Sequence, residues 1–82
     1  MIDSKKYDMR KVAANIEGIV KGRASKEDRP MYDIFIDIDD WSYDKYAYYV
    51  KKNPRAINTT FLDMILNNFN CSVKDLTKGA KK

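Results

Sequence analysis

The 82-residue sequence has no histidine, one cysteine, two prolines and three glycines. The absence of histidine excludes acid–base catalysis or metal binding by imidazole groups. Cys71 has no second cysteine with which to form an internal disulfide, which favours a reducing compartment. No apolar run approaches the roughly 20 residues of a membrane span, and no signal peptide opens the chain, so we expect a cytoplasmic protein. The scarcity of proline and glycine indicates regular structure with short connections.

Charged residues, in contrast, are abundant and unevenly distributed. Residues 27–44 contain seven acids and one cation, a net charge of −6, whereas the other 15 cations and five acids give the remaining chain +10. Such polarity favours a basic surface that meets an anion, with nucleic acid as the leading candidate. A charge run taken alone, however, favours a solvated surface. The basic segment carries more weight because aromatic residues are interleaved with it.

The hydrophobic pattern predicts one compact all-α domain of five helices over residues 1–82, with a loose N-terminal arm at 1–7 and a basic tail at 80–82. Asp8 is suited to cap a first helix, which we expect to end at residues 21–23 and to be followed by a polar connector at 24–29. Its predicted core stripe consists of Val12, Ala13, Ile16, Ile19 and Val20. Residues 31–39 fit both a strand and a helix. We favour the helix, because a short isolated strand would have no partner elsewhere in the chain.

Three further helices complete the prediction. The first spans 42–52, with Ser42 or Asp40 as its cap, and ends by Asn53 because the residue before a proline disfavours the helical region. The next begins at a Thr60-x-x-Asp63 start signal, and the last occupies about 73–78 behind a similar signal and ends at a glycine. The apolar face of the fourth helix is formed by Phe61, Leu62, Ile65, Leu66 and Phe69.

The stretch from Trp41 to Arg55, WSYDKYAYYVKKNPR, combines five aromatic residues with four cations and one acid. On a helical wheel one face is apolar: Tyr43, Tyr46, Ala47 and Val50. The other face holds two cations and two phenols: Lys45, Tyr48, Tyr49 and Lys52. Exposed tyrosines beside lysines are unusual on a solvated face, since tyrosine is usually at least partly covered. The second face is therefore a candidate contact surface.

The segment FLDMILNNFNCSVKDL resembles the closing part of Cro/lambda-repressor-like helix-turn-helix domains, and NIEGIV at 15–20 resembles their first helix. The resemblance covers about residues 10–79 and implies a recognition helix at 42–52, with Ala47 and Val50 inside and Asn53 at a left-handed turn position. The middle of the chain departs from the family: MYDIFIDIDD has acids and large isoleucines where the second helix usually has glutamine and a small residue.

The resemblance implies DNA contacts by the start and exposed side of the recognition helix, and the basic residues that follow extend this set. The candidate DNA-binding residues are Asp44, Lys45, Tyr48, Tyr49, Lys51, Lys52 and Arg55. Lysine neutralises phosphate and tyrosine hydroxyls bond phosphates or base edges, whereas Asp44 would need a cytosine amino group as its donor. Two alternatives stay open: Tyr48 and Tyr49 could be half-buried at a dimer seam, and Arg55 could be a solvated turn residue.

The sequence thus supports two functions from different classes. The first is a sequence-specific repressor of the phage or mobile-element type that binds double-stranded DNA, as a homodimer because one short helix contacts few bases. The second is a protein-interaction or inhibitor module that uses the acidic segment 27–44, in the manner of a nucleic-acid mimic. We expect no cofactor and no enzymatic activity. Asp37, Asp39 and Asp40 lack the spacing of a calcium loop, so a solvated acidic face is favoured over a metal site.

Overall fold

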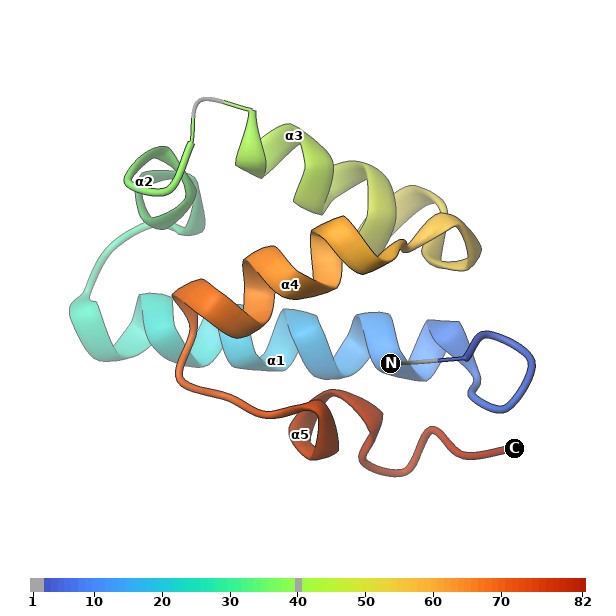
Figure 1. The fold of residues 1–82 in the computed structure, drawn as a ribbon. Helices are drawn as coiled ribbons and strands as arrows, with labels where there is room; N and C mark the ends of the chain where they lie inside the picture. The colour runs from blue at the N-terminus through green and yellow to red at the C-terminus, as the bar shows by residue number, and fades with distance from the viewer. Residues whose placement is uncertain (1–2, 40) are drawn as a thin grey trace.

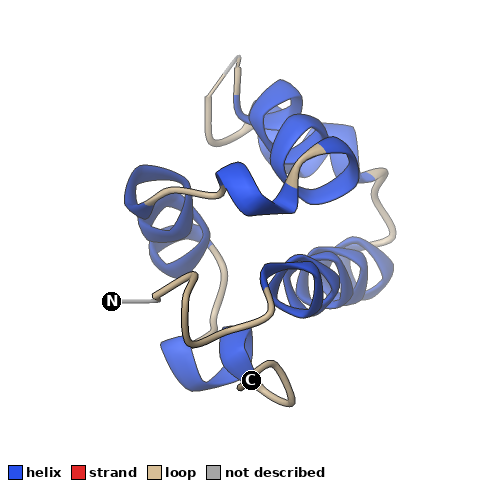
Figure 2. Cartoon of the chain, turned by 90° about the vertical axis from the view of Figure 1, so that its right-hand side faces the viewer, coloured by secondary structure: helices blue, strands red, loops and turns tan. Residues whose placement is uncertain are grey.

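The computed structural model describes residues 3–39 and 41–82, which form helices joined by short connections (Figure 1). The α-helices are α1 (Met9–Glu27), α2 (Met31–Ile36), α3 (Ser42–Tyr46), α4 (Thr59–Asn68) and α5 (Val73–Thr77). A π-helical segment, η1 (Ala47–Lys52), continues α3 without a break, and a 3₁₀ turn, η2 (Pro54–Ala56), follows it. Figure 2 shows helices around a common interior and no strand in the described chain. The all-α prediction is confirmed.

Helix α1 is the longest described element, and α2, η1, η2 and α5 pack against it. The Asp8 carboxylate accepts a hydrogen bond from the Arg10 backbone N–H at 3.0 Å, so the predicted cap is confirmed. The predicted stripe also holds: Val12, Ala13, Ile16 and Val20 are buried, and Ile19 is partly buried. The helix does not end at residues 21–23, however, and the predicted connector at 24–29 is wrong. Ala24 packs into the core, and the helix continues to Glu27.

Asp28 ends α1 in a left-handed conformation, with φ 51° and ψ 47°, while its N–H bonds to the carbonyls of Ala24 and Ser25. The true connector is therefore residues 28–30, in which Pro30 is the N-cap of α2. Residues 31–36 are helical, which confirms the helix over the strand for this part of 31–39. Ile34 and Phe35 of α2 are buried in the core, and Met31 is partly buried against it.

The second half of the chain closes the core. Phe61, Leu62 and Ile65 of α4 and its C-cap Phe69 are buried, as the apolar pattern predicts, and Leu66 is partly buried. Its start was wrongly predicted, since Asn58, and not Thr60, caps the helix by accepting from the Phe61 N–H at 2.9 Å. Ser72 and Asp75 form the predicted capping box of α5.

Asn15 ties α5 to the first helix. Its side-chain amide donates to the carbonyls of Leu76 and Lys78, both at 2.9 Å, and so satisfies groups that the end of a helix leaves free. Gly79 then turns the chain with φ 70°, and the buried Ala80 follows.

The two ends of the chain meet beside the start of α1. Residues 1 and 2 lie outside the described part of the chain, but residues 3–7 form a turn where we expected a loose arm. Tyr7 and Lys81 form an isolated antiparallel bridge, and the Lys82 N–H donates to the Lys6 carbonyl at 2.9 Å. Backbone pairing therefore holds both the arm and the basic tail against the helical body. No described helix is long and apolar enough to cross a membrane.

Candidate nucleic-acid interface

The continuous helix of α3 and η1 spans residues 42–52, the range predicted for the recognition helix. One side is anchored by Tyr46, which has no exposed surface, and by Val50, which is 9% exposed. The Tyr46 ring packs 4.8 Å from the ring of Phe35 in α2. Tyr43 extends this aromatic contact, with its ring centroid 6.0 Å from that of Phe35. The inner face predicted from the wheel is therefore the packing face, and its position relative to α2 is set by ring contacts.

Ser42 fastens the turn between α2 and α3. Its buried hydroxyl is 2.5 Å from the Phe35 carbonyl and 2.8 Å from the Asp39 carbonyl. Ser42 is thus the first helical residue and not the N-cap, which is Trp41. The Trp41 N–H donates to the Asp39 carboxylate at 2.8 Å. The other predicted cap, Asp40, lies outside the described residues.

The exposed side of this helix carries most of the predicted site. Six of the seven candidates are exposed: Asp44, Lys45, Tyr48, Lys51, Lys52 and Arg55. Tyr49 is the exception and is only partly exposed, because the start of α4 packs beside it. Its ring lies 4.9 Å from that of Phe61, while the Tyr48 ring meets it edge-on at 5.2 Å. The two tyrosines therefore differ in exposure: Tyr48 is 47% exposed, whereas Tyr49 is partly covered and packs against the Tyr48 ring.

Both phenol oxygens accept hydrogen bonds from asparagine side chains. Asn58 donates to the Tyr49 oxygen at 3.0 Å, and Asn53 donates to the Tyr48 oxygen at 3.4 Å. Because each tyrosine acts as an acceptor within the protein, its own hydroxyl hydrogen is left to donate outward. A phosphate oxygen or a base acceptor is a suitable partner for such a donor.

The end of the helix has an uncommon geometry. The Asn53 N–H donates to the Tyr48 carbonyl at 2.8 Å, a π-helical i to i+5 bond. Asn53 itself is not left-handed, in contrast to what the family resemblance implied, since its φ is −144° and its ψ is 73°. The following Pro54 is consistent with this, because a proline disfavours the helical region at the preceding residue. The chain turns through η2 instead, which carries Arg55.

Five of the seven predicted residues line surface clefts, and they do not all share one cleft. Four of them line a shallow cleft of about 330 Å³ on α3 and η1, together with a fifth residue: Asp44, Lys45, Tyr48, Tyr49 and Trp41. Arg55 lines a separate cleft with Arg10 of α1. Lys51 and Lys52 are exposed in the last turn of η1.

Trp41 and Arg10 were missed by the sequence reasoning. Trp41 is 67% exposed at the entrance to α3. Its place at the head of the aromatic stretch was a signal, but it precedes the helix and so fell on neither face of the wheel. Arg10 gives no local signal, because only the packing of α1 against η2 brings it near Arg55.

The acidic segment is partly neutralised by arginines. Arg29 forms ion pairs with Glu27 at 3.2 Å and Asp37 at 2.6 Å, and Arg23 also pairs with Glu27. The hydrogen bond from Arg23 is the main cause that lowers the pKa of Glu27. The bond to Asp37 is the main cause that raises the pKa of Arg29. These pairs fasten the connection between α1 and α2, and they occupy part of the acidic surface.

The described parts of the chain contain possible metal ligands and the single cysteine. Among residues 3–39 and 41–82, no three or more acidic or cysteine side chains converge to hold a metal ion. Burial raises the pKa of Cys71, which packs against the core between α4 and α5, and so disfavours its reactive thiolate form.

Comparison of the chain with family models, with curated proteins and with solved structures finds no match.

Proposed function

We propose that this protein is a sequence-specific DNA-binding regulator, a repressor of the phage or mobile-element type with a helix-turn-helix domain. In this proposal α2 and α3 are the paired helices, and α3 with η1 is the recognition helix. A single observation carries the proposal. The helix at 42–52 is anchored by a fully buried tyrosine on one side and presents lysines and an exposed tyrosine on the other. Such a helix has the width and the donors needed to enter a major groove.

The exposed residues divide into two roles. Lys45, Lys51 and Lys52 supply positive charge for backbone phosphates, which gives affinity without sequence selectivity. Tyr48, beside Asp44, offers a ring for thymine methyl contact and a hydroxyl donor for a base edge. Because Tyr49 and two asparagines hold these rings, the contact surface is ordered before DNA arrives.

A titration of duplex DNA by mobility shift at several salt concentrations tests the proposal. We expect affinity to fall steeply with salt, and the double variant Lys45→Ala/Lys52→Ala to reduce the slope of log K against log salt by about two. The matched control is Lys21→Ala/Lys74→Ala, which removes two exposed lysines from α1 and α5. Wild-type protein that fails to bind DNA at low salt, or a control that weakens binding equally, would contradict the proposal.

The proposed regulator acts as a homodimer, since one helix of this length reads too few bases for operator selectivity. Dimers of this class place their half-sites about 34–36 Å apart along the duplex. Sedimentation of the protein with and without a selected operator tests this expectation. A one-to-one complex on the complete operator would contradict it.

A second candidate function is protein binding through the acidic segment 27–44. The observation in its favour is that Tyr32 and Ile36 of α2 are 53% and 44% exposed beside the exposed Asp33. Arg29 opposes it by pairing with two of the acids. A pull-down that survives Lys45→Ala but is lost on neutralising Asp37, Asp39 and Asp40 would favour this function over DNA binding.

A further inference from the structure

A cleft of about 410 Å³ lies where the start of α1, the N-terminal turn, η2 and the C-terminus meet. Three of its lining residues are cations from distant parts of the sequence: Arg10, Arg55 and Lys82. Asp8 is its one acid. The cleft therefore collects positive charge that no single stretch of sequence contains.

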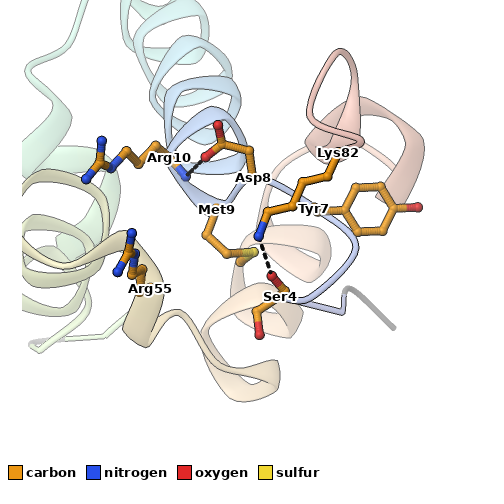
Figure 3. Close-up of a pocket in the computed structure, with 7 residues that line it drawn as sticks. All are labelled: Ser4, Tyr7, Asp8, Met9, Arg10, Arg55 and Lys82. Atoms are coloured by element: carbon orange, nitrogen blue, oxygen red, sulfur yellow. Dashed lines mark hydrogen bonds between the residues drawn. The ribbon is translucent and has the colours of Figure 1, made fainter.

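The Asp8 carboxylate and the Lys82 ammonium already form hydrogen bonds within the protein. The Asp8 carboxylate caps α1 through the Arg10 backbone N–H, and the Lys82 ammonium donates to the Ser4 carbonyl at 3.4 Å (Figure 3). The guanidinium groups of Arg10 and Arg55, in contrast to these two groups, have no such partner in the described residues. Neither forms an ion pair or a hydrogen bond with any residue in 3–39 or 41–82.

Figure 3 shows these two guanidinium groups projecting from separate elements to the same side of the cleft. Two cations that share a cleft repel each other, and an anion between or beside them relieves that repulsion. Arginine suits a phosphate in particular, because its planar fork of N–H donors bonds two phosphate oxygens at once.

The cleft lies at the C-terminal end of the proposed recognition helix. Arg55 follows η1 after only two residues, and α1 packs against both η1 and η2. Exposed Lys51 and Lys52 precede it, so the basic residues continue from the helix to the cleft. A surface with several cations suits DNA, which carries about one negative charge per 1.7 Å of helix axis.

We propose that Arg10 and Arg55 form a phosphate-binding site that takes a DNA backbone phosphate next to the bases read by α3 and η1. This inference rests on the proposed function and adds to it a contact from α1. The site contributes affinity and register, but no base selectivity, because a phosphate is the same at every sequence.

The test compares Arg10→Gln, Arg55→Gln and the double variant in the DNA titration. We expect the double change to lower the salt slope by about one, because both arginines bind the same phosphate, and each single change to lower it by less. The ratio of affinities for preferred and scrambled duplexes should stay within about twofold of wild type. Arg10→Lys/Arg55→Lys should retain the slope but bind more weakly, because lysine keeps the charge and loses the fork. Lys21→Gln/Lys74→Gln is the charge-matched control.

The outcomes separate this inference from the proposed function. If wild type binds DNA and the double glutamine variant keeps the wild-type slope, the phosphate site is refuted and the DNA-binding proposal stands. If wild type does not bind DNA, both the DNA-binding proposal and the phosphate site on DNA are refuted. NMR of the arginine Nε–H signals during titration with inorganic phosphate then tells whether the cleft binds free phosphate instead. Thermal unfolding of each variant verifies that it is folded.

Discussion

Tyr46 gives the folded protein a specific sensitivity to alkaline pH. Its ring is fully buried, and burial, followed by the nearby charges of Glu17 and Tyr43, raises the pKa of its phenol from the usual 10 to about 12. An unfolded chain releases this proton near pH 10, whereas the folded chain keeps it until about pH 12. The stability that this group contributes is therefore complete below pH 10 and is lost as pH rises through 12.

The magnitude follows from the two pKa values of Tyr46. Each pH unit of difference corresponds to about 1.4 kcal/mol, so the total loss is about 3 kcal/mol, and about half of it has occurred at pH 11. That is a large part of the stability of a small domain, which is typically about 5–15 kcal/mol. Because Tyr46 anchors the helix at 42–52, we expect the loss to release the proposed DNA-contacting surface.

Tyr46→Phe removes the titrating group and keeps the ring. Among residues 3–39 and 41–82 the Tyr46 hydroxyl donates only to the Met31 sulfur, at 4.0 Å, so the substitution should cost less than about 1 kcal/mol at pH 7. Urea unfolding of wild type and variant from pH 7 to pH 11 measures the difference between their unfolding free energies. We expect this difference to move by about 1.4 kcal/mol in favour of the variant between pH 9 and pH 11. Parallel curves for the two proteins would refute the reasoning, since all other titrating groups are shared.

Four other substitutions and measurements test local features. Ser42→Ala should destabilise the protein by about 1–2 kcal/mol in urea unfolding, because it removes a buried hydrogen bond, and should weaken DNA binding; unchanged stability would contradict this. Asp28→Gly should stabilise it by about 0.5–1 kcal/mol by relieving the left-handed conformation, and a fall in stability would count against that cause. Asn58→Ala should cost about 1 kcal/mol whereas Asn58→Asp retains the cap, so equal losses would exclude capping as the reason. Cys71 should react with a thiol reagent more slowly in the folded protein than in urea, and equal rates would refute its burial.

The core was largely predictable because it depends on periodicity within single helices. The stripes on α1 and α4 and the inner face of the helix at 42–52 follow the 3.6-residue repeat, and all their residues are buried or partly buried. Helix ends were predictable where one cap dominates, as at Asp8 and Ser72. The start of α4 was mispredicted because both Asn58 and Thr60 are residues that can cap a helix. The end of α1 was mispredicted because the helix continues past residues 21–23 to Glu27.

In the candidate site, too, the features that depend on one helix were predictable and those that depend on packing were not. The exposure of Lys45, Tyr48 and Lys52 followed from the helical wheel. The partial cover of Tyr49 did not, because it depends on the approach of Phe61 from α4, 12 residues further along the chain. The wheel describes one helix in isolation and contains no information about what packs beside it.

By itself, the sequence determined the helical class, the buried stripes and the face of the helix at 42–52 that points outward, because each depends on local residue order. The tertiary structure alone decided that Ser42 would lock the turn between α2 and α3, and that Arg10 and Arg55 would share a cleft. Those features join elements that are separate in the chain. Their geometry depends on how the helices pack around Tyr46 and Phe35, which local periodicity does not encode.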